Sequence, residues 1–331
     1  MTVLADTTPP LRGLLAANLI CMASMLIWAA GLPAADHLIP LLPHDQLNAL
    51  RVGLAGLTLI PVWALMEGLR PLARVNWLKG IAVGSLIGLG AWLLIMGQAR
   101  GGAVTAAVIS STLPVVGIAL EVVLDGRKLT AALLIGLALS LIGGVLVLAG
   151  NFFSLEFVQG AFVLHIKPMS PSTTGSGLSL GLGALLCFGS VVTFALGSRL
   201  TVTAFPDQTA IGRTAVTLVG AGIAASVVAL GQFTLGMAPA PDFHAWGWTE
   251  LGALLLYSIG GMAISQVLWI MSVERLGIGL SSLHINAAPF YVMIILFAMG
   301  QPWNWSQALA AALVGFGVLV AQGIIPLGRR A

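Results

Sequence analysis

The sequence predicts an all-α integral membrane protein with ten transmembrane helices, arranged as two inverted repeats of five helices. Three observations carry this prediction: the composition, the spacing of the apolar runs and an internal repeat. Hydrophobic residues make up 58% of the 331 residues and charged residues only 8%, against roughly 25% in an ordinary soluble domain. The mean hydropathy is +1.03. A water-soluble globule is therefore excluded.

Apolar runs of about 20 residues recur along the chain, and each is long enough to cross the ~30 Å hydrocarbon core of a bilayer. They fall at 13–35, 46–66, 77–99, 103–124, 130–149, 178–199, 208–231, 249–272, 278–299 and 306–326. The first run is longer than a typical signal-peptide core, and a single base, Arg12, precedes it. We therefore expect it to be retained, so that ten spans place both termini on one side.

Basic residues predict which side the termini occupy. With a cytoplasmic N-terminus, ten of the 14 bases fall in cytoplasmic segments and two, Arg100 and Lys167, fall outside. Cytoplasmic loops of membrane proteins carry an excess of Lys and Arg. The distribution therefore predicts a multi-pass protein of the inner membrane with both termini in the cytoplasm.

The longest break between apolar runs divides the chain into two halves. It contains the segment 170–177, whose Ser, Thr and Gly composition is typical of a flexible linker. The predicted organisation is a cytoplasmic tail at 1–12, a first repeat at 13–149, an external linker at 150–177, a second repeat at 178–326 and a cytoplasmic tail at 327–331.

The two halves share local sequence matches at constant offsets. Leu94–Gly102 matches Trp269–Gly277 and Pro114 matches Pro289 at an offset of 175, while Gln46 matches Gln208 and Arg51 matches Arg213 at an offset of 162. Because each half holds an odd number of helices, the second half enters the membrane in the opposite orientation. Inverted repeats of this kind are typical of alternating-access transporters.

This order of features resembles the drug/metabolite transporter superfamily, and within it the EamA-type exporters. The resemblance rests on ten spans in two copies, an arginine early in the second span of each copy and a proline in the fourth. One departure is that the family usually carries a Gly-Glu pair at the end of the fourth span. This chain has Gly126-Arg127 and Gly300-Gln301 there. The resemblance implies a ten-helix exporter.

Two prolines are expected to break helices inside the membrane. Pro114 and Pro289 each remove a helical N–H, which frees the carbonyl of Ser110 or Ile285. Irregular backbone at membrane depth is tolerated where it lines a wet cavity, and such breaks point to binding sites in transporters. The alternative is an ordinary kink. The polar neighbours that favour a substrate cavity are Ser110, Ser111, Ser281, Ser282, His284 and Asn286.

His284 is the one ionisable group near the middle of a predicted span. Substrate contact and proton coupling are both open for it, because a histidine can change charge near neutral pH; a neutral packing role is the third alternative. We expect Asn286 to be the best single substrate ligand, since its amide offers donors and an acceptor one turn before the second proline.

Further candidates come from deep aromatic and polar residues. Trp28, Trp92, Gln266, Trp269 and Tyr291 are expected either to contact substrate or to fill volume. Arg51 and Arg213 lie five residues past the matched glutamines, roughly 8 Å into their helices. They are expected to be access-pathway charges, unless they extend to the lipid headgroups.

Missing motifs narrow the chemistry. The sequence holds no HExxH, GxSxG, Walker or paired CxxC pattern, and Cys21 and Cys187 both fall within apolar runs. We therefore expect neither an enzyme nor a bound metal or cofactor. A cation exporter would require a central carboxylate, and a sugar-phosphate carrier would require a deep cluster of bases; neither is predicted.

The sequence predicts a secondary transporter or facilitator that exports small metabolites across the inner membrane by alternating access. Basic intramembrane charges favour amino acids or related zwitterionic and carboxylated compounds. The alternatives are a drug or cation exporter, a lipid-moving protein and a membrane scaffold. The expected partners are a small-molecule substrate, the lipid bilayer and protons as a candidate coupling ion, with no nucleic acid. A monomer and a homodimer are both compatible with the sequence.

Overall fold

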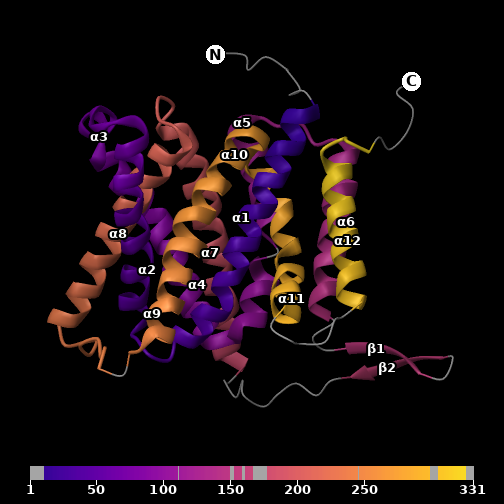
Figure 1. Cartoon of the computed structure of the whole chain (residues 1–331). Coiled ribbons are helices and arrows are strands. Elements are labelled where there is room, and N and C mark those ends of the chain that lie inside the picture. Colours follow the sequence, from indigo (N-terminus) through magenta and orange to yellow (C-terminus); the bar gives the residue numbers. More distant parts are fainter. Residues whose placement is uncertain are drawn as a thin grey trace.

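The computed structural model describes residues 11–110, 112–149, 153–158, 161–166, 177–244, 246–298 and 305–325. These residues form a helical bundle (Figure 1). The first half contributes α1 (Leu11–Leu38), α2 (His44–Glu67), α3 (Leu69–Arg74), α4 (Trp77–Ser110), α5 (Leu113–Asp125) and α6 (Ala131–Ala149). The second half contributes α7 (Gly177–Ala204), α8 (Ala210–Thr234), α9 (Trp248–Leu255), the π-helix η1 (Leu256–Ile264), α10 (Ser265–Ser282), the 3₁₀ helix η2 (Leu283–Ala287), α11 (Ala288–Ala298) and α12 (Trp305–Ala321).

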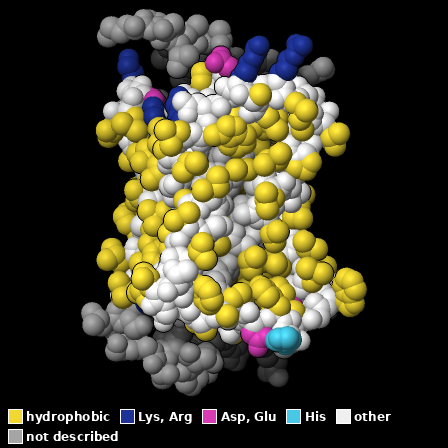
Figure 2. Space-filling model, turned by 90° about the vertical axis from the view of Figure 1, so that its left-hand side faces the viewer, with side chains coloured by type: hydrophobic (Ala, Val, Ile, Leu, Met, Phe, Trp, Pro, Cys, Tyr) yellow, Lys and Arg dark blue, Asp and Glu magenta, His cyan; other side chains and the backbone are white. Residues whose placement is uncertain are grey.

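The outer surface of the bundle is apolar over most of its height. Six helical segments among the described residues are long and apolar enough to cross a membrane: Gly13–Ala35, His44–Glu67, Trp77–Arg100, Gly181–Ala204, Ala210–Thr234 and Trp248–Ala287. Shorter apolar stretches occur in α6 and α12. Figure 2 shows hydrophobic side chains covering the face between the two ends, with Lys and Arg gathered at one end. The prediction of a multi-pass helical membrane protein is confirmed.

A short hairpin interrupts the helical architecture between the two halves. Strands β1 (Phe153–Val158) and β2 (Ala161–Ile166) pair antiparallel, with Phe153 opposite Ile166. The hairpin lies at the end of the bundle opposite the start of α1 and the end of α12 (Figure 1). The Ser, Thr and Gly composition of this part of the chain predicts only a flexible linker. Both strands are rich in aromatic and branched residues, which favour strands.

Helix breaks precede both prolines instead of falling at them. The helix assignment of α4 is continuous across the predicted boundary at Arg100–Gly102, and the interruption lies between Ser110 and Leu113. Pro114 is the second residue of α5, and Pro289 is likewise the second residue of α11, directly after η2. A proline is tolerated in the first turn of a helix, because the N–H that it lacks has no helical partner there.

Helices from the two halves pack against each other. Helix α4 lies against α7 and α8, α2 against α8, α1 against α10, and α6 against α12. Glycines allow the closest of these approaches: a β-carbon at Gly84 of α4 would lie 2.6 Å from the Ala221 amide nitrogen, and one at Gly56 of α2 would lie 2.7 Å from that of Val219. The backbone of α8 is therefore held between α2 and α4.

We expect Gly84→Ala to destabilise the protein by about 1–3 kcal/mol, because the added methyl group meets the backbone of α8, which cannot move aside. Gly181→Ala is the matched control, since no atom lies within 4 Å of its added β-carbon. Thermal unfolding in detergent, followed by size-exclusion chromatography, measures the difference. An equal melting temperature for both variants would contradict the close α4–α8 contact.

Candidate functional site

A cavity lies inside the bundle between helices of both halves. It encloses about 60 Å³ of space that the centre of a water molecule can reach, which is room for a few waters. Most of its wall is apolar. The polar side chains on the wall are Ser24, Arg51, Ser110, Ser190, Ser265 and Gln266, and the aromatic ones are Trp28, Phe194 and Trp269.

Arg51 is the charged residue on this wall among the described residues. Its side chain extends from α2 and the residue is 3% exposed. The guanidinium carbon lies 4.0 Å from the ring centroid of Tyr257, a cation–π contact. The Nε and Nη1 atoms have no hydrogen-bond partner among the described residues. Arg51 is therefore buried beside the cavity instead of extending to the headgroups, and part of its hydrogen-bonding capacity is unused.

The π-helix η1 presents the ring that Arg51 contacts. Tyr257 is the second residue of η1, and Met262, farther along the same helix, lines the cavity. π-Helices are rare and occur frequently at functional sites. The π-helix η1 thus contacts Arg51, the charged residue of the cavity wall.

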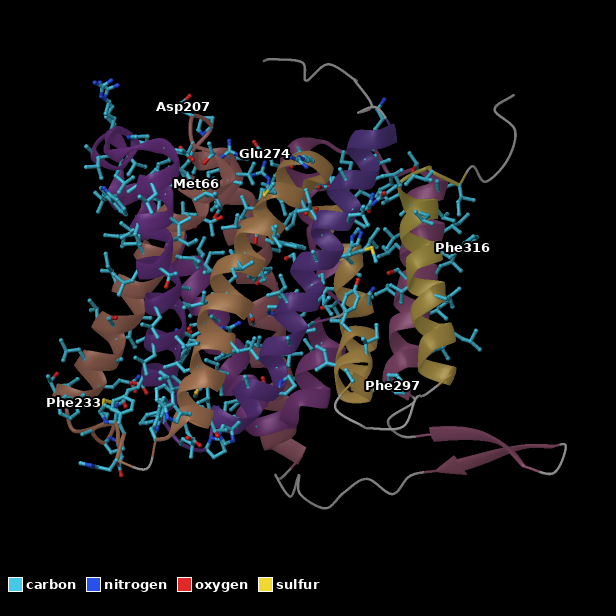
Figure 3. All side chains as sticks on the ribbon, viewed as in Figure 1. Met66, Asp207, Phe233, Glu274, Phe297 and Phe316 are labelled. Carbon is cyan, nitrogen blue, oxygen red and sulfur yellow. The ribbon has the colours of Figure 1, made fainter. Side chains whose placement is uncertain are left out.

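Arg213, which the sequence match pairs with Arg51, is held by two backbone carbonyls and an acid. Its Nε donates to the Phe205 carbonyl at 2.8 Å and its Nη2 to the Pro206 carbonyl at 3.0 Å. Its Nη1 lies 2.8 Å from Glu274 Oε1. Figure 3 shows Glu274 near the end of the bundle where α1 begins. Arg213 does not line the cavity. The two matched arginines therefore occupy different environments.

Further ion pairs close the same end of the bundle. Asp125 at the end of α5 pairs with Arg199 of α7, whose Nε lies 3.1 Å from Oδ2. Glu121 of α5 pairs with Arg127 and accepts the Gly279 N–H of α10 at 2.9 Å. Together with the Arg213–Glu274 pair, these contacts connect α5, α7, α8 and α10.

The structure brings some of the predicted site residues together and separates others. Trp28, Ser110, Gln266, Trp269 and the predicted pathway charge Arg51 all line the cavity. Six predicted residues do not line it: Trp92, Ser281, Ser282, His284, Asn286 and Tyr291. Ser111 lies outside the described residues, and the side chain of Pro289 is not described.

The polar residues of η2 contact neighbouring structure instead of the cavity. Asn286 Nδ2 donates to Ser140 Oγ of α6 at 2.9 Å. His284 Nδ1 lies 3.2 Å from the Ser281 carbonyl oxygen, and Ser282 Oγ donates to the Gly279 carbonyl at 2.8 Å. The cavity instead receives the apolar Ile285. A 3₁₀ helix turns by three residues per turn instead of 3.6, so an α-helical face does not describe this segment.

Three cavity residues that sequence reasoning missed follow a simple pattern. Ser24, Ser190 and Ser265 each stand four residues before an aromatic residue of the same wall: Trp28, Phe194 and Trp269. Residues i and i+4 share one helix face, so this spacing could have found them. The hydroxyls of these three serines also form hydrogen bonds to backbone carbonyls that hold the cavity wall in place. Ser24 donates to the Ser265 carbonyl at 2.7 Å, Ser190 to that of Gly90 at 2.7 Å, and Ser265 to that of Gly261 at 2.8 Å.

Gln266 lines the cavity and is expected to contact the ligand, whereas Asn286 bonds Ser140 and is expected to have a packing role. We expect Gln266→Ala to weaken ligand binding several-fold, because its amide lines the cavity. Asn286→Ala should lower the melting temperature and leave affinity within about twofold, because it removes the bond to Ser140. Titration calorimetry and thermal unfolding of both variants measure this. Weakened binding in a well-folded Asn286→Ala protein, with Gln266→Ala unaffected, would place the ligand beside η2.

Comparisons with known proteins agree with the fold and the sequence resemblance. Residues 15–149 match the model of the EamA-like transporter family. Over 177 residues the chain is 29% identical to "Uncharacterized transporter YyaM" of Bacillus subtilis (strain 168), an alignment covering 52% of this chain. The alignment spans 56%, about half, of that relative's length.

A solved structure described as "Crystal structure of protein" is similar over nearly the whole fold. The TM-score is 0.69 at 22% identity, covering 96% of this chain and 99% of the other. At that identity the likeness shows the fold alone. The family match over residues 15–149 supports the resemblance found in the sequence: the first half of the chain is similar to the EamA-like transporter family.

Proposed function

We propose that this transporter is a secondary carrier or facilitator that exports small carboxylated metabolites, such as amino acids and related compounds, across the inner membrane. One observation carries the proposal. Arg51 is buried on the cavity wall with Nε and Nη1 unpaired among the described residues. An arginine fork, formed by Nε and Nη2 or by Nη1 and Nη2, matches a carboxylate with two parallel hydrogen bonds, so an anionic substrate group supplies a partner for one of the two unpaired atoms.

We further propose ten spans in two inverted repeats that act by alternating access. Support comes from the equivalent helix breaks, since Pro114 and Pro289 each occupy the second position of a helix that follows a short interruption. The matched arginines Arg51 and Arg213 give further support, because each lies near the start of its helix. Transporters with this symmetry rock one group of helices against another around a site between the halves.

In this mechanism, the ion pairs at one end of the bundle act as a gate that controls access to the cavity. Opening that end would separate Arg213 from Glu274 and Asp125 from Arg199, which belong to different helices. The distribution of bases supports a cytoplasmic location for this end, where α1 begins and α12 ends (Figure 1).

A drug or cation exporter fits the cavity less well. The charged wall residue among the described ones is a base, so a buried cation would be repelled there and would find no counter-charge. The function of a lipid-moving protein or a scaffold does not require a buried arginine on the wall of a cavity. A transport assay separates these classes.

We expect purified protein in proteoliposomes to transport small carboxylates and not lipophilic cations. Arg51→Gln should reduce the initial flux at least tenfold, because an interaction with a charged group contributes about 1.5–3 kcal/mol. Arg51→Lys should retain part of the flux, since it keeps the charge without the fork. Radiolabelled uptake under counterflow measures these rates.

Arg70→Gln is the matched control, because Arg70 is exposed on α3 and far in sequence from the cavity residues. It should transport like the wild type. Full carboxylate flux in Arg51→Gln, or transport of cations alone by the wild type, would contradict the proposal.

A further inference from the structure

The charge on the cavity wall has one sign. Among the described lining residues Arg51 is charged, and none is an aspartate or glutamate. The remaining polar groups are the neutral hydroxyls of the serines and the amide of Gln266. A carboxylate entering this cavity therefore meets a buried guanidinium, while a positively charged group meets no counter-charge.

An α-amino acid carries its ammonium on the carbon next to the carboxylate. If the carboxylate binds Arg51, the ammonium is held within a few ångströms of the same guanidinium. Like charges at that separation repel each other, and the effect grows where water is excluded. Neutral acceptors on the wall can hydrogen-bond the ammonium, but removing an ammonium from water without a counter-charge is costly. The amino group is therefore expected to add no affinity.

The wall next to Arg51 suits an apolar body. Arg51 stacks on Tyr257, and Met262 follows on the same helix η1. The backbone of α1 at Trp28 lies close to η1, because a β-carbon at Gly261 would be 3.9 Å from the Trp28 carbonyl oxygen. An apolar chain extending from the carboxylate would thus lie along Met262 and Trp28, both of which line the cavity.

From these observations we infer that the preferred ligands are monocarboxylates with an apolar body and no amino group. The inference rests on the proposed function, since it narrows the substrate class of the same cavity. The carboxylate binds Arg51, and the apolar body displaces the few waters that the cavity can hold.

Four compounds that share one branched carbon skeleton test this inference on purified full-length protein by titration calorimetry. They are 4-methylpentanoate with the carboxylate alone, leucine with both charges, 3-methylbutylamine with the amine alone, and the neutral 4-methylpentanamide. We expect 4-methylpentanoate to bind at least as tightly as leucine. The amide should bind at least about tenfold more weakly, and the amine should not saturate.

The Arg51→Gln variant should bring the affinity for 4-methylpentanoate down to that for the amide, while Arg70→Gln keeps the wild-type order. The comparison of four ligands on the wild type needs no variant, so it stands even if Arg51→Gln fails to fold. Leucine binding tenfold or more tightly than 4-methylpentanoate would overturn the inference and leave the proposed function intact. Equal binding of acid and amide, or binding of none of the four, would overturn both.

Discussion

The cavity of this bundle depends on one buried charge, the guanidinium of Arg51. A buried charge without a partner costs several kcal/mol, and protein structures rarely retain one without a functional reason. Here the surrounding structure compensates only in part. The ring of Tyr257 contacts one face of the guanidinium, while Nε and Nη1 have no partner among the described residues. Arg51 also lines the cavity, and we propose that its side chain turns toward an anion bound there.

The two arginines that match between the halves of the sequence have different surroundings, and a difference in sequence accounts for this. At the offset of 175, the residue that matches Glu274 is Ala99. The acid that pairs with Arg213 in the second half therefore has no counterpart in the first half. Arg213 joins carbonyls and a carboxylate of its own chain and helps to close one end of the bundle. Arg51 has no such acid and lines the cavity. The two matched arginines therefore differ, because one is paired with an acid and the other lies on the cavity wall.

Much of the helical architecture was predictable, because membrane spans need long apolar runs and the bilayer sets their length. The first two predicted spans, 13–35 and 46–66, lie within α1 and α2. The hairpin of β1 and β2 was not predicted, since its two short strands carry a far weaker signal than a span. The helix break was predicted at Pro114 itself, but it lies just before this residue, between Ser110 and Leu113. A proline is tolerated in the first turn of a helix, so the next helix begins there.

The candidate site was only partly predictable for a related reason. Trp28 and Trp269 were identified as deep aromatics, and both line the cavity. Asn286 and His284 were predicted as site residues from their polarity and their place before Pro289, whereas Ile285 of the 3₁₀ helix η2 is the residue of this segment that lines the cavity. Such a local change of winding depends on tertiary packing, which periodicity alone does not reveal.

The serines that fix the wall could have been found by spacing. Their separation of four residues from Trp28, Phe194 and Trp269 repeats on three helices, and helices from both halves contribute. Convergence on one cavity, however, required the packing of α1, α7 and α10.

A structure of the protein with a transported carboxylate bound shows directly whether Arg51 holds the substrate. We expect the ligand in the cavity, with its carboxylate oxygens about 2.7–2.9 Å from the guanidinium nitrogens of Arg51, the range of charge-assisted hydrogen bonds. A carboxylate bound instead beside Asn286 and His284, with Arg51 still unpaired, would contradict it.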